Sequence, residues 1–113
     1  MKYNKLVRDK IPKIIKENGG DPKIHIANSS EYWEKLKEKL LEEVDEFFEA
    51  RNHEEAADIL EVLGAIFEYL KLNKKLLKSE KTSKALKRGK FKKKIILYQI
   101  YKVSQYSYYL ISF

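Results

Sequence analysis

The sequence predicts an all-α protein: a small helical bundle built on an antiparallel helix hairpin and completed by dimerisation. Two long segments, residues 31–50 and 54–72, repeat apolar side chains at the spacing of an α-helix. Only a tight turn separates them, so the two helices are expected to pack side by side. With 113 residues, 43% hydrophobic and 36% charged, the chain can bury one modest core, which a second subunit would enlarge.

The first long helix is expected over residues 31–50. Ser29 and Ser30 supply capping hydroxyls, and Glu31 in the first turn favours the helix dipole. Trp33 lies on the apolar arc of this helix and is expected in the core. The arc consists of Trp33, Leu36, Leu40, Val44 and Phe47.

The second long helix is expected over residues 54–72, after a turn at residues 51–53 in which Asn52 is a candidate cap. Glu61 and Glu68 project away from its apolar side and are expected in water. The apolar stripe consists of Ile59, Leu63, Ile66 and Leu70.

The segment before the hairpin is expected to contain one short helix. Residues 2–8 show no periodicity and are expected to form an arm over the surface. Pro12 suits the first turn of a helix over residues 11–18, which Gly19-Gly20 would end. Residues 23–27 alternate like a strand but lack a partner strand, which predicts an extended connector.

After the hairpin, a third helix is expected over residues 74–87, capped by Asn73 and ended by Gly89. Residues 1–94 are expected to form one domain. Residues 95–113 are expected to be an aromatic-rich tail, whose role no motif indicates.

Four acidic side chains of the hairpin lie on or beside the apolar faces. At about 100° per residue Glu43 projects within about 20° of Leu36, and Glu46 follows one turn later. Glu55 falls inside the apolar stripe of the second helix, and Asp58 follows it by three residues. Converging carboxylates need a neutralising cation, and carboxylate ligands without His or Cys suit Mg²⁺. The alternative is an ordinary solvated acidic face that pairs with lysines.

These carboxylates form an ExxE pattern followed by ExxD on adjacent helices, which resembles the MazG-like, or phosphoribosyl-ATP pyrophosphohydrolase-like, all-α nucleotide pyrophosphohydrolases. Three further segments agree with one small branch of that family, and the resemblance covers roughly residues 1–97. The segments are residues 3–12 (YNKLVRDKIP), residues 58–62 (DILEV), and Lys87-Arg88-Gly89 followed by Phe91.

The resemblance implies Mg²⁺-dependent cleavage between the α and β phosphates of a nucleotide, with release of pyrophosphate. It implies Glu43, Glu46, Glu55 and Asp58 as metal ligands, and we expect Glu43 and Glu46 in catalysis. Glu42 or Glu46 is the candidate general base. Only eight residues separate Glu46 from Glu55, fewer than in many larger relatives, so a nucleoside triphosphate and a phosphoribosyl-ATP-like substrate both stay open.

Charge is divided unevenly along the chain. Residues 1–73 carry 12 Lys and Arg against 16 Asp and Glu, a net −4, whereas residues 74–113 carry 12 against one, a net +11. A basic half beside a metal site predicts a polyanionic ligand such as a triphosphate, and a basic third helix alone would equally suit nucleic acid. A solvated basic face is the alternative to both. The residues expected to bind substrate are Arg8, Lys84, Lys87 and Arg88, with Lys90 a further candidate.

Other classes of protein are disfavoured. The chain has no cysteine, and its two histidines lack a nearby second ligand, which argues against disulfide and zinc sites. Residues 1–8 lack the apolar core of a signal peptide, so a cytoplasmic location is expected. Polar side chains are spread through residues 95–113, which argues against a membrane span. The remaining alternatives to a hydrolase are a non-enzymatic nucleic-acid-binding module and a protein that only mediates assembly.

Overall fold

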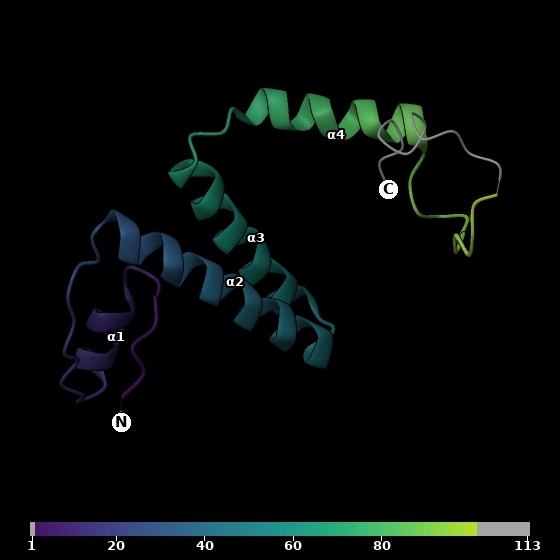
Figure 1. The fold of residues 1–113 in the computed structure, drawn as a ribbon. Helices are drawn as coiled ribbons and strands as arrows, with labels where there is room; N and C mark the ends of the chain where they lie inside the picture. The colour runs from purple at the N-terminus through teal and green to yellow at the C-terminus, as the bar shows by residue number, and fades with distance from the viewer. Residues whose placement is uncertain (1, 102–113) are drawn as a thin grey trace. The chain divides into compact units, whose positions relative to one another are not determined.

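The structure is a computed structural model that describes residues 2–101. Within those residues the chain forms four α-helices and no strand, as the sequence predicts. They are α1 (Ile11–Glu17), α2 (Ser29–Ala50), α3 (His53–Tyr69) and α4 (Lys74–Arg88), labelled in Figure 1. Internal contacts divide the chain into two units, residues 1–73 and 74–113, which are described separately below.

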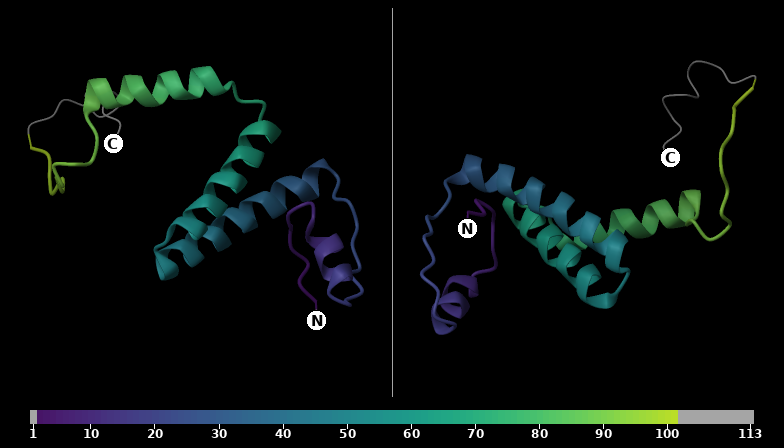
Figure 2. Two further views of the ribbon diagram at one scale, coloured as in Figure 1. Left: turned by 180° about the vertical axis from the view of Figure 1, so that it is seen from behind. Right: turned by 90° about the horizontal axis from the view of Figure 1, so that it is seen from below.

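The hairpin of α2 and α3 is the centre of the first unit (Figure 1), and the two helices stay side by side in both views of Figure 2. Arg51 ends α2 in the left-handed conformation, with φ of 54°, and its amide donates to the Phe47 carbonyl at 2.7 Å. Asn52 then caps α3, because its Oδ1 accepts the amide of Glu55 at 2.9 Å. The turn between the helices is therefore only two residues long, and the predicted Asn52 cap is confirmed.

The start of α2 differs from the prediction. Asn28, and not Ser29 or Ser30, is the cap: its Oδ1 accepts the amide of Glu31 at 2.9 Å. The helix begins two residues earlier than expected, so both serines lie inside its first turn. The physical reason is that Asn caps a helix as well as Ser does, and Asn28 has the extended backbone that a cap requires.

The core of the first unit is small. Leu36, Val62 and Ile66 are buried, and partly buried apolar side chains from both helices and from the arm pack around them. Trp33 stacks on Tyr69, with ring centroids 5.1 Å apart, which confirms Trp33 as a core residue. Glu61 and Glu68 are exposed, as expected.

The end of α3 also differs from the prediction. The helix stops at Tyr69 instead of residue 72, because Lys71 adopts φ of 56° and the Leu72 amide bonds back to the Phe67 carbonyl at 2.9 Å. Leu70 is exposed as a result, so its place in the predicted apolar stripe is wrong.

The segment before the hairpin follows the prediction closely. The short helix α1 starts with Pro12 in its first turn, and Gly19, with φ of 86°, follows its end. Residues 23–27 have no regular secondary structure, as an extended connector should. In the arm, Leu6 packs against the hairpin core and ties residues 2–10 to the hairpin.

In the second unit the structure describes residues 74–101. Helix α4 ends one residue later than expected, and Gly89, with φ of 82°, follows it. Residues 95–101 contain no helix or strand, and the remainder of the predicted tail, residues 102–113, lies outside the described residues. The predicted domain boundary after Lys94 stays a prediction. A search of residues 2–101 finds no helix with the length and apolar character needed to cross a bilayer.

Candidate functional site

Five carboxylates meet where α2 and α3 pack together. Oxygen atoms of Glu42, Glu43 and Glu46 lie within 4.8 Å of one another, and those of Glu43, Glu55 and Asp58 form a second group of the same size. Glu43 belongs to both groups. The structure therefore brings together the four predicted metal ligands, Glu43, Glu46, Glu55 and Asp58, with Glu42 beside them.

Local structure explains why these side chains converge. Glu43 and Glu46 lie one turn apart on α2 and so share a face of that helix. Glu55 is fixed in the first turn of α3 by the hydrogen bond from its amide to Asn52, and Asp58 follows one turn later. The two-residue turn places the last turns of α2 beside the first turns of α3.

Burial makes this cluster different from a solvated acidic face. Glu43 is only 6% exposed. One oxygen of Glu43 and one of Glu55, the Oε2 atom in each case, are buried and have no hydrogen-bond partner within residues 2–101. A buried carboxylate oxygen without a partner is unfavourable, and a bound cation would satisfy both atoms. Hard oxygen donors with no His or Cys among them fit Mg²⁺.

The pKa shifts show that the cluster is short of positive charge. The negative charge of Glu43 raises the pKa of Glu46, and desolvation of Glu46 adds to the shift. Desolvation raises the pKa of Glu55, and the neighbouring charges of Asp58 and Glu43 raise it further. In both cases the protein favours the protonated form, which is the expected result when carboxylates crowd together without enough cations.

Two cations of the arm reach the rim of the cluster. Lys5 Nζ lies 2.8 Å from Glu42 Oε1, and Arg8 Nη2 lies 2.7 Å from Asp58 Oδ1. The hydrogen bond from Lys5 lowers the pKa of Glu42. Arg8, predicted to bind substrate, thus lies at the carboxylates.

Lys39 is a member of the site that sequence reasoning missed. Its Nζ lies 3.3 Å from Glu43 Oε1 and 3.8 Å from Glu42 Oε1. It neutralises one oxygen of Glu43 and leaves the other unpartnered. The signal was present in the sequence, because Lys39 precedes Glu43 by one helical turn.

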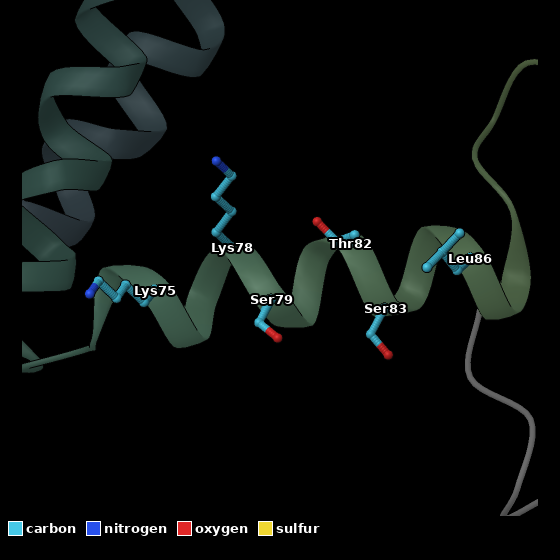
Figure 3. Close-up of a pocket in the computed structure, with 6 residues that line it drawn as sticks. All are labelled: Lys75, Lys78, Ser79, Thr82, Ser83 and Leu86. Carbon is cyan, nitrogen blue, oxygen red and sulfur yellow. The ribbon is translucent and has the colours of Figure 1, made fainter.

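The other predicted substrate-binding residues belong to the second unit. Lys84, Lys87 and Arg88 are exposed on α4, and none of the three forms an ion pair within residues 2–101. Their action on a substrate held by the carboxylates stays a prediction. The surface depression on α4 is open and is formed by this helix alone (Figure 3). It is lined by Lys75, Lys78, Ser79, Thr82, Ser83 and Leu86.

Comparisons with known proteins leave the function open. No protein-family model matches the chain, and no solved structure matches it. One similar protein, from Mycolicibacterium smegmatis (strain ATCC 700084 / mc(2)155), is described as an uncharacterized protein; it is 42% identical over 53 residues. The match covers 47% of this chain and 54% of that protein, so the chain spans about half the length of its relative.

Proposed function

We propose that the protein is a Mg²⁺-dependent nucleotide pyrophosphohydrolase of the MazG-like type. It cleaves the α–β phosphoanhydride of a nucleoside triphosphate or a phosphoribosyl-ATP-like substrate and releases pyrophosphate. The observation that carries the proposal is the burial of Glu43. This carboxylate is 6% exposed, its Oε2 has no hydrogen-bond partner among residues 2–101, and it lies in both acidic groups. Buried carboxylate oxygens without a partner are rare in native proteins, so this atom supports a cation site more than a structural salt-bridge network.

The carboxylates divide into holding and reacting groups. Glu43, Glu55 and Asp58, which form one of the two acidic groups, would hold Mg²⁺. Bound Mg²⁺ supplies neutralisation of phosphate oxygens and activation of water. Because hydrolysis also needs a proton acceptor, one carboxylate must stay able to take a proton from the attacking water.

Glu46 suits this role better than Glu42. Glu46 is exposed to water and forms no ion pair within residues 2–101, so its carboxylate can take a proton from the attacking water. One oxygen of Glu42 accepts a hydrogen bond from Lys5, and this bond lowers the pKa of Glu42.

The substrate phosphates require cations. Arg8 lies at the carboxylates and offers a guanidinium that can hold phosphate with two hydrogen bonds. A phosphate-binding role of Lys84, Lys87 and Arg88 stays a prediction of the sequence.

We also propose that the protein forms a homo-oligomer, because several large apolar side chains of the hairpin are exposed. These side chains are Leu41, Phe48 and Leu60. A cytoplasmic location stays a prediction of the sequence.

The direct test is pyrophosphate release from a panel of nucleotides with and without Mg²⁺. The variants Glu43→Gln and Glu55→Gln keep the side-chain shape but remove the charge, and both should lose Mg²⁺-dependent turnover. Glu49→Gln is the matched control, since Glu49 is exposed on α2 outside the cluster. Turnover retained in both cluster variants would refute the assignment of the site.

A second candidate function is nucleic-acid binding by the second unit. Residues 74–101 carry eleven Lys and Arg against one acidic residue, Glu80. Phe91 and Tyr98 are exposed beside these cations and could stack on bases. Binding of single-stranded RNA that weakens steeply with salt and survives Glu43→Ala would support this function. A protein that only mediates assembly would show neither this binding nor stabilisation by Mg²⁺.

A further inference from the structure

The N-terminal arm crosses both helices of the hairpin at the acidic cluster. Lys5 contacts Glu42 of α2, and Arg8 contacts Asp58 of α3. Between these two cations, Leu6 packs against the hydrophobic core. The arm is thus anchored by an apolar side chain and presents one cation on each side of it.

The two arm contacts are of a kind that breaks easily. The side chains of Lys5 and Arg8 are 42% and 56% exposed, and exposed ion pairs contribute little to stability because water screens them. Lys39 is different, since its side chain is 20% exposed and it lies on the same helix as its partners. Lys5 and Arg8 can therefore leave their carboxylates while Leu6 keeps the arm in place.

A divalent ion would compete with these cations. Like charges repel strongly at distances of a few ångströms, and Asp58 cannot give the same oxygen to Arg8 and to a metal. Once displaced, both cations would stay within a side chain's length of the metal, where the phosphates of a substrate must lie. A guanidinium and an ammonium are the groups that proteins use to hold phosphate.

We propose that Lys5 and Arg8 exchange partners during ligand binding: they neutralise Glu42 and Asp58 in the metal-free protein and turn to the substrate's phosphate chain when Mg²⁺ is bound. This inference rests on the proposed function, because it requires both Mg²⁺ and a phosphate ligand. It assigns Lys5 a phosphate-binding role and gives the arm an effect on metal affinity.

The first experiment measures the affinity of the full-length protein for Mg²⁺ alone by calorimetric titration. Lys5→Gln and Arg8→Gln each remove a competing cation, so each should bind Mg²⁺ about threefold to tenfold more tightly than the wild type. Lys13→Gln is the matched control, because Lys13 lies on α1 and its only recorded ion pair within residues 2–101 is with Glu17 at 3.9 Å. It should leave Mg²⁺ affinity unchanged.

The second experiment measures binding of inorganic tripolyphosphate in saturating Mg²⁺. This ligand probes the phosphate site without a nucleobase. The same two variants should bind tripolyphosphate roughly tenfold more weakly, and Arg8→Lys should recover part of the loss. In these variants the affinity for Mg²⁺ should thus rise and the affinity for tripolyphosphate should fall. A merely structural role for the arm would weaken both together, and that result would overturn the inference.

The outcomes also separate this inference from the proposed function. If wild type does not bind Mg²⁺, the proposed function fails. If wild type binds Mg²⁺ but Lys5→Gln and Arg8→Gln bind it as Lys13→Gln does, the partner exchange alone is wrong. If the two variants bind tripolyphosphate as tightly as wild type, or if wild type does not bind it, Lys5 and Arg8 have no phosphate-binding role.

Discussion

Replacing Glu43 by glutamine should have opposite effects on stability with and without Mg²⁺. Glu43 is 6% exposed and its Oε2 lacks a partner, and such an unsatisfied buried group costs about 1–3 kcal/mol. The variant gives up the contact with Lys39, 3.3 Å away, which is worth up to about 1 kcal/mol. The amide nitrogen of glutamine can donate to a neighbouring carboxylate of the cluster, so without Mg²⁺ the variant should be more stable by about 1 kcal/mol, or roughly 4–8 °C in a unit of 73 residues.

With Mg²⁺ the order should reverse. At a concentration 100 times the dissociation constant, a ligand that binds only the folded state adds about 2.7 kcal/mol to the wild type. That corresponds to an increase of roughly 10 °C or more in its melting temperature. Glu43→Gln should gain much less, because it lacks the carboxylate that belongs to both acidic groups.

Thermal melts followed by circular dichroism, in EDTA and in a Mg²⁺ titration, measure both effects. The matched control Glu49→Gln should follow the wild type in each condition. The reasoning fails if Glu43→Gln is less stable than wild type in EDTA and if Mg²⁺ raises the melting temperature of both proteins by the same amount. In that case Glu43 would be a structural ion-pair residue and not a metal ligand.

Three further predictions follow from the same geometry. Because the pKa values of Glu46 and Glu55 are raised above the ordinary 4.5, the native metal-free protein holds more protons than the unfolded chain. The stability that these groups contribute is present below pH 4.5 and is lost as the pH rises through their native pKa values. Chemical denaturation in EDTA should show this loss, and Glu55→Gln should show less of it; an unchanged pH profile in the variant would contradict the crowding of charges. Asn52→Ala removes the cap of α3 and should lower stability by about 1 kcal/mol; it should also weaken Mg²⁺ binding, since Glu55 loses its fixed position. Normal Mg²⁺ affinity in that variant would show that the cap does not position Glu55. Phe48→Ser should shift the sedimentation coefficient toward that of a monomer, since Phe48 is 67% exposed on α2, and a wild type that is already monomeric would rule out the oligomer.

The hairpin and its buried carboxylate could be predicted because helical periodicity reports directly on burial. Glu43 was expected near Leu36 on the apolar arc, and both side chains are buried. The ends of the helices were harder to place. Asn28, Ser29 and Ser30 are all good capping residues, and nothing in their order distinguishes the one that the backbone selects.

The contacts of the arm could not be predicted from the sequence. Lys5 and Glu42 are 37 residues apart, and Arg8 and Asp58 are 50 residues apart. The arm has no periodicity that would indicate which side faces the hairpin. The packing of Leu6 against the core helps to position the two cations, and that packing depends on the three-dimensional arrangement of α2 and α3.

The position of the carboxylates along the helices explains why they need not act alike. Glu55 lies in the first turn of α3, where the helix dipole favours a negative charge, although desolvation and the charges of Asp58 and Glu43 raise its pKa. Glu55 nevertheless has a buried oxygen without a partner, and Glu46 is exposed to water. A carboxylate with a buried oxygen that lacks a partner suits a permanent metal ligand. A carboxylate that is exposed to water suits a group that takes up a proton during each turnover and returns it to solvent.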